Sequence, residues 1–87
     1  MDKIKLYATY NGQCYLKGYR GKFYRKGVEL IDIEDCNGNI VVEKTRKSLT
    51  KALEKCLDLV SGTKIEFEAV LNDNDISYIS NVKVKNI

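Results

Sequence analysis

A basic and aromatic segment near the N-terminus has the residue types best suited to binding chemistry. Residues 15–27 read YLKGYRGKFYRKG and hold five positive charges, four aromatic rings and no negative charge. Single-stranded nucleic acid is bound by this combination, because cations follow the phosphate backbone while flat rings stack on bases, at about 1 to 3 kcal/mol per base. The segment therefore predicts a nucleic-acid site. The alternative is that its rings pack in the core of a small β domain.

Rings and cations alternate within this segment. In an extended conformation Tyr15 and Lys17 share one face while Tyr24 and Lys26 share the other, so each face carries both kinds of side chain. Tyr15 and Phe23 are the two rings that we expect to be core. The predicted nucleic-acid-binding residues of the segment are Lys17, Tyr19, Arg20, Lys22, Tyr24, Arg25 and Lys26.

A second basic cluster consists of Lys44, Arg46, Lys47 and Lys51, directly before and within an apolar periodic stretch. Cations at the N-terminal end of a helix oppose its macrodipole, so this placement invites a functional explanation. An ordinary charged surface is the alternative. We expect Lys44, Arg46 and Lys47 to assist in binding nucleic acid.

The net charge of +3 conceals a separation of charge along the chain. Residues 1–28 carry seven basic residues and one acidic residue, whereas residues 29–43 carry five acidic residues and no basic one. The basic N-terminal third suits a polyanionic partner. A bipolar chain also suits electrostatic docking on another protein.

The residue types that are missing argue against catalysis. Histidine is absent, which removes the commonest general base, the Ser-His and Cys-His pairs and most zinc sites. No group of residues assembles a nucleophile, a base and an oxyanion site, so we predict that the chain is not an enzyme and uses no cofactor or metal.

The three cysteines form no CxxC pair, which favours small buried thiols in a reducing cytoplasm. The charged N-terminus has no apolar run of the length of a signal peptide or membrane span, so we expect a cytoplasmic protein without a membrane partner.

Alternating apolar residues indicate the strands that position these side chains. The predicted strands cover residues 3–10, 28–35, 39–42, 64–71 and 76–85. Asn11-Gly12 and Asn37-Gly38 predict tight turns, since Asn and Gly tolerate positive φ. Residues 72–75, a run of Asn and Asp, predict another turn.

Two further segments follow other patterns. The glycines of residues 14–26 predict a bent strand or a glycine-hinged loop. Apolar residues at helical spacing from Leu49 to Val60 predict an amphipathic helix, with Ser48 as its N-cap and Gly62 as its stop.

The resulting order is five strands with a helix between the third and the fourth, if residues 11–26 are a loop or an extension of the first strand. This is the element order of the OB-fold, a small five-stranded Greek-key barrel. The chain, residues 1–87, is expected to be a single domain of this kind.

Three stretches also carry a resemblance to a known group of proteins. They are VELIDIEDCNGNIVVEK, SLTKALEKCLDLVSGTKIEFEAVL and ISNVKVKNI, and they cover most of residues 28–87. They resemble small OB-fold proteins of phages and other mobile elements of low-GC bacteria. The resemblance implies a ligand groove flanked by loops at residues 11–26 and 72–77. The first loop suits nucleic acid, whereas Asp73 and Asp75 in the second would oppose phosphates.

These patterns together predict a non-catalytic module that binds single-stranded DNA or RNA through residues 15–26. The alternative is a small phage-type inhibitor or accessory factor whose partner is a protein, for example a CRISPR effector or another host complex that handles nucleic acid.

Overall fold

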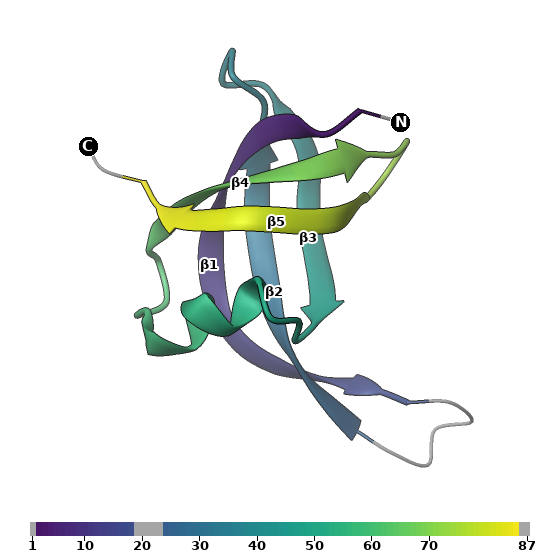
Figure 1. Cartoon of the computed structure of the whole chain (residues 1–87), viewed down its shortest axis with the longest axis vertical. Helices are drawn as coiled ribbons and strands as arrows, with labels where there is room; N and C mark the ends of the chain where they lie inside the picture. The colour runs from purple at the N-terminus through teal and green to yellow at the C-terminus, as the bar shows by residue number, and fades with distance from the viewer. Residues whose placement is uncertain (1, 19–23, 86–87) are drawn as a thin grey trace.

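The computed structural model describes residues 2–18 and 24–85. Within these residues, five strands form one antiparallel sheet and a short 3-10 helix follows the third strand (Figure 1). The strand order in the sheet is β3-β2-β1-β4-β5. The elements are β1 (Ile4–Lys17), β2 (Tyr24–Glu34), β3 (Ile40–Ser48), η2 (Leu53–Asp58), β4 (Lys64–Leu71) and β5 (Ile76–Val84).

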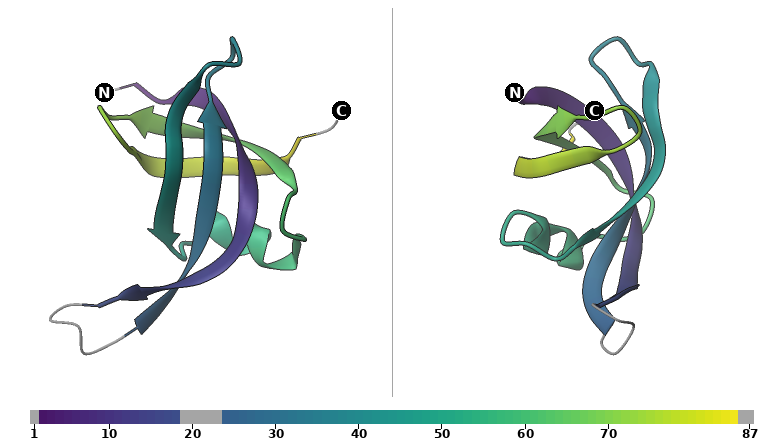
Figure 2. Two further views of the ribbon diagram at one scale, coloured as in Figure 1. Left: turned by 180° about the vertical axis from the view of Figure 1, so that it is seen from behind. Right: turned by 90° about the vertical axis from the view of Figure 1, so that its right-hand side faces the viewer.

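Strand β1 joins the two parts of the sheet. Residues 4–9 of β1 pair with β4, and β1 also pairs with β2 as far as Lys17 opposite Tyr24. Strands β4 and β5 therefore lie across the layer formed by β1, β2 and β3, which Figure 1 shows from the front and Figure 2 from behind and from the side. The sheet is strongly curled as a result.

The two edges of this sheet are β3 and β5. Every pairing in the described residues is antiparallel, so β3 and β5 have the same polarity as β1 in the order of the sheet, although β5 crosses the layer of β1, β2 and β3 (Figure 1). The predicted mainly β class, the five strands and the position of the helix between the third and fourth strands agree with this structure. The sheet is not closed across the described residues, so the barrel and the OB-fold stay predictions.

The tight turn predicted at Asn11-Gly12 is wrong. Strand β1 continues through these residues, and its register with β2 shifts between Tyr10 and Gln13. Gly12 has a φ of 104°. Positive φ serves a bulge as well as it serves a turn, and here it bends a long strand instead of ending it.

The amphipathic helix predicted from Leu49 to Val60 is also largely wrong. Strand β3 extends to Ser48, which lies opposite Gly27 in the ladder and caps no helix. Only Leu53–Asp58 is helical, and the side-chain oxygen of Thr50 accepts a 3.3 Å hydrogen bond from the Leu53 backbone N–H. Pairing with β2 therefore reaches the predicted N-cap, Ser48, and, through its backbone N–H, Leu49, the first residue of the predicted helix. The helix ends before Gly62, whose φ of 100° serves the following turn.

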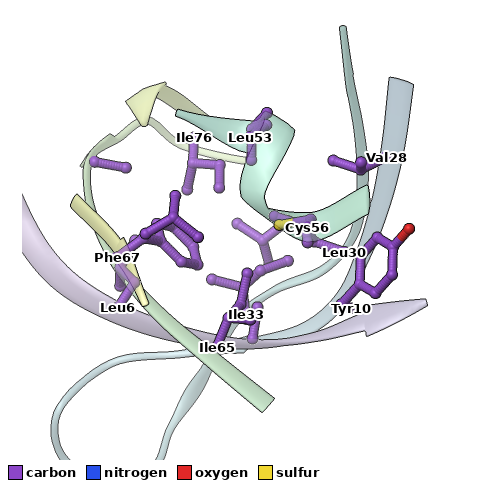
Figure 3. Close-up of a cluster of buried hydrophobic side chains, with 14 residues drawn as sticks. Leu6, Tyr10, Val28, Leu30, Ile33, Leu53, Cys56, Ile65, Phe67 and Ile76 are labelled. Atoms are coloured by element: carbon purple, nitrogen blue, oxygen red, sulfur yellow. The ribbon is translucent and has the colours of Figure 1, made fainter. Parts of the chain in front are cut away.

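The core lies between the two crossed layers, and η2 covers one end of it (Figures 1 and 3). Alternate residues of the strands point into it, as the sequence predicts for β1 and β4. Leu53 and Cys56 fill it from η2. The core residues that Figure 3 labels are Leu6, Tyr10, Val28, Leu30, Ile33, Leu53, Cys56, Ile65, Phe67 and Ile76.

The other two predicted turns are confirmed. At the Asn37-Gly38 turn, the Asp35 carboxylate accepts hydrogen bonds from the backbone N–H groups of Asn37 at 2.9 Å and Asn39 at 3.0 Å. These bonds lower the pKa of Asp35, the bond from Asn39 most of all. At residues 72–75, the Asn72 N–H donates to the Asp75 carbonyl oxygen at 2.8 Å.

The cysteines differ in environment more than the sequence predicts. Cys56 is buried, and burial raises the pKa of its thiol. Cys14 is half-buried, and Cys36 is exposed beside the Asn37-Gly38 turn. The prediction of small buried thiols is therefore confirmed for Cys56 alone.

Candidate nucleic-acid interface

Strands β1 and β2 continue beyond the rest of the sheet as a two-stranded ribbon (Figure 1). Pairing between β2 and β3 stops where Gly27 lies opposite Ser48. A Cβ on Gly27 would lie 2.5 Å from the carbonyl oxygen of Lys47, so the close approach of these two strands requires glycine. The Leu49 N–H then donates to the Lys26 carbonyl oxygen at 3.0 Å. Beyond this point, no third strand pairs with the part of the ribbon that the structure describes.

The register of the ribbon places two tyrosines and two lysines on one face. Tyr15 lies opposite Lys26, and Lys17 lies opposite Tyr24. Residues opposite each other in an antiparallel pair share a face, and alternate residues of one strand do so too. We call this set, Tyr15, Lys17, Tyr24 and Lys26, the ribbon face. The sequence analysis treated the segment as one extended strand and therefore placed Tyr15 and Lys17 on one face and Tyr24 and Lys26 on the other. The pairing of two strands puts all four on the same face.

Both rings of the ribbon face are open to solvent. Tyr15 is 62% exposed and Tyr24 is 66% exposed. The expectation that Tyr15 belongs to the core is wrong, because the ribbon projects beyond the layer that covers the core (Figure 1). Arg25 lies on the opposite face with half-buried Leu16 and is itself exposed.

Three of the predicted binding residues, Tyr19, Arg20 and Lys22, lie outside the described residues. Phe23, which was expected in the core, lies outside them too. The described part of the predicted segment thus contributes Lys17, Tyr24, Arg25 and Lys26, to which the structure adds Tyr15.

The second basic cluster does not form one surface. Lys44, Arg46 and Lys47 are on strand β3, so Lys44 and Arg46 share one face and Lys47 points to the other. Arg46 lies opposite Glu29 on the outer face, and exposed Lys44 shares that face. Lys47 lies opposite Val28, which is buried in the core, and so points to the inner face.

Arg46 is held by an acidic partner. Its Nε donates to Glu29 Oε1 at 2.9 Å, and the Asn11 side-chain amide donates to Glu29 Oε2 at 2.6 Å. The hydrogen bond from Arg46, followed by the one from Asn11, lowers the pKa of Glu29. The pKa of Arg46 is raised in return, chiefly by the same hydrogen bond. Arg46 is therefore a weaker phosphate ligand than the sequence suggests.

Lys47 and Thr45 join the edge strand β3 to the turn before β5 through Asp75. The Lys47 Nζ is 2.7 Å from Asp75 Oδ2, and the Thr45 hydroxyl donates to Asp75 Oδ1 at 2.6 Å. Burial raises the pKa of Asp75, but these hydrogen bonds and one from the Ile76 N–H outweigh it and hold the pKa below its usual value. The charge of Asp75, which the sequence suggests would oppose phosphates, is thus matched by Lys47.

A groove between the edges of β3 and β5 contains residues that the sequence analysis missed. The groove, of about 560 Å³, is lined by residues of both edge strands and of the segment before η2. Tyr78 is on its rim and is 72% exposed. The alternation of residues in β5 does not predict the exposure of Tyr78. Bulges in the β4–β5 pairing shift the register on both sides of the pair formed by Glu68 and Ser80.

Fold and site together define a small antiparallel β protein with an exposed aromatic and cationic ribbon. Within the described residues, no three metal-ligating side chains come together, and no helix has the length and apolar character needed to cross a membrane. Comparison of the chain with protein-family models, curated proteins and solved structures found no match.

Proposed function

We propose that this protein is a non-catalytic module that binds single-stranded nucleic acid on its ribbon face. The observation that carries the proposal is the cross-strand register, which brings two exposed tyrosines and two lysines together. The Cβ atoms of directly opposite residues lie about 5 Å apart, so Tyr15 has Lys26 beside it and Tyr24 has Lys17 beside it. A base that stacks on Tyr15 or Tyr24 would therefore keep its phosphate near Lys26 or Lys17.

The charges of the ribbon favour an anionic ligand. Among the described residues, the ion pairs join Lys5 to Glu66, Arg46 to Glu29 and Lys47 to Asp75. The cations of the ribbon are in none of these pairs. Unpaired bases expose the flat surfaces that stacking needs, which is why a single strand suits this face better than a duplex.

We further propose that the curled sheet is an OB-fold whose closing strands have separated. Strand β1 pairs with both β2 and β4, the helix lies between β3 and β4, and the antiparallel pairings give the two edge strands the same polarity. These features support the proposal, because a barrel of this topology would close by bringing β3 against β5.

Fluorescence anisotropy with a labelled oligonucleotide at low salt tests the proposed function. We expect binding by the wild type and a loss of affinity of roughly tenfold for each ring removed in Tyr15→Ala and Tyr24→Ala. Tyr24→Phe keeps the stacking surface and should bind nearly as well as the wild type. Absence of binding at high micromolar protein and low salt would refute the function.

A protein partner is the second candidate function, and the open edge of β3 favours it. Edge strands offer unpaired backbone groups to which another chain can add a strand, and Ile40 at the start of β3 is 53% exposed. A host protein captured by the wild type should bind directly when purified, should lose affinity for Ile40→Lys and should keep it for Tyr24→Ala. Equal binding to Ile40→Lys would contradict docking at this edge.

A further inference from the structure

The groove between β3 and β5, which we call the seam groove, is separate from the ribbon face. Its floor is apolar and includes Leu53 and Ile79, and its rim carries Lys47, Lys51 and Tyr78. Its volume of about 560 Å³ is within the range of small-ligand clefts, roughly 300 to 1,000 Å³. It is lined by residues of both edge strands, which do not pair with each other within the described residues.

Tyr78 is held at this groove by an unusual backbone conformation. Its φ is 56°, in the left-handed region that a bulky residue rarely adopts. A register shift between β4 and β5 lies at the same place, between the pairs Glu68 with Ser80 and Val70 with Ser77. Bulges redirect side chains and are common beside binding sites. Here the bulge leaves the ring 72% exposed rather than packed on the core.

The cations of the seam groove are not equivalent. Lys47 is joined to Asp75 and is mostly covered, with 23% of its side chain exposed. Lys51 is exposed and takes part in no ion pair among the described residues. An aromatic ring, an apolar floor and an available ammonium group together match a flat base attached to a phosphate.

A backbone hydrogen bond connects the ribbon face to the segment that lines the seam groove. Lys26 of the ribbon face accepts a backbone hydrogen bond from Leu49 at 3.0 Å, and the residues that follow Leu49 line the groove as far as Leu53. A bound strand that leaves the ribbon face at Lys26 would therefore meet Lys51 next.

We propose that the seam groove holds one unpaired nucleotide of the strand that the ribbon face binds. The base stacks on Tyr78 over the floor formed by Leu53 and Ile79, and its phosphate contacts Lys51. The inference rests on the proposed function and extends its footprint from the ribbon to the open edge of the sheet. It makes affinity depend on strand length, because a short strand reaches only one of the two places.

Oligothymidylates of about 4 and about 12 nucleotides, the range of site sizes of such modules, provide the probe. We expect Tyr78→Gly and Lys51→Gln to weaken binding of the longer strand roughly tenfold and roughly threefold, and to leave the shorter strand, held by the ribbon face, almost unchanged. Tyr78→Gly removes the ring while glycine accepts the positive φ without strain, so a loss of affinity is not a loss of fold. Lys55→Gln, at an exposed lysine of η2, is the matched control.

Photocrosslinking of the longer strand with 5-iodouracil at each position identifies the contact directly. A crosslink to residues 77–79 supports the inference. If Tyr24→Ala weakens binding while Tyr78→Gly and Lys51→Gln bind both strands as the wild type does, the inference is wrong and the function of the ribbon face stands. If the wild type binds neither strand, both are wrong.

Discussion

At the scale of single residues, Asp75 is the side chain on which the contact between the sheet edges depends. It lies in the turn before β5 and accepts hydrogen bonds from Thr45 at 2.6 Å and from Lys47 at 2.7 Å, both on the edge strand β3. Thr45 is buried, so its hydroxyl would lose its partner if Asp75 were removed. The Asp75 side chain itself is 50% exposed, which keeps the energy of this contact modest.

Asp75→Asn should lower the free energy of unfolding at pH 7 by about 1 kcal/mol. The pKa of Asp75 is depressed in the folded state, so the stabilisation is fully present above the ordinary Asp pKa of about 4 and is lost as the pH falls below it. The difference between wild type and variant should therefore shrink between about pH 5 and about pH 2. Urea denaturation across this range measures it. Asp73→Asn, an exposed residue of the same turn, is the control, and a difference that is constant with pH would contradict the assignment.

At the scale of elements, η2 is short but covers the open end of the core. Leu53 is 1% exposed and Leu57, in the same helix, is only half-buried. The six residues of η2 are too few for helical propensity alone to keep this segment helical. Burial of Leu53 and Cys56 is what holds it against the sheet.

Leu53→Ala should therefore destabilise the protein by about 2 to 5 kcal/mol, because it leaves a cavity that the rigid sheet cannot fill. Leu57→Ala is the matched control, and it should lower the free energy of unfolding by less than half as much as Leu53→Ala does. Thermal and urea unfolding of both variants would measure the two costs. Similar values for both positions would mean that η2 does not close the core as the structure indicates.

The elements also show where prediction from sequence succeeds. Residues 64–71 are predicted as a strand and are β4, because buried Ile65 and Phe67 alternate with polar residues in the first half of this strand. Asn11-Gly12 and Asn37-Gly38 are the same dipeptide in two roles, a bulge and a turn. Local residues permit both, and the pairing of β1 with β2 on each side of Gly12 decides between them.

The arrangement of the predicted site residues on the sheet was not predictable for a similar reason. The face that Tyr24 shares depends on the register between β1 and β2, and that register is not contained in the alternation of one strand. The pairing of Arg46 with Glu29 and of Lys47 with Asp75 likewise depends on tertiary contacts. The composition of residues 15–27 nevertheless identified the segment in which Tyr15 and Tyr24 are exposed.

At the scale of the whole molecule, the charges that are separated along the chain are only partly matched in space. Arg46 and Lys47 of β3 are paired within the fold, whereas the ribbon extends its cations away from the core (Figure 1). The field of the protein is therefore expected to be most positive along the ribbon, and an anionic strand would be steered to it.

This asymmetry predicts how affinity for an oligonucleotide depends on salt. Each phosphate neutralised releases counterions from a single strand and contributes about 0.7 to the slope of log affinity against log salt concentration. The double variant Lys17→Gln/Lys26→Gln should reduce this slope by about 1 to 1.5. Tyr24→Ala should lower affinity at every salt concentration and leave the slope unchanged, because stacking releases no counterions. Lys83→Gln, at an exposed position of β5, is the control for total charge. A slope that falls equally for Lys83→Gln would mean that net charge, and not the ribbon face, binds the strand.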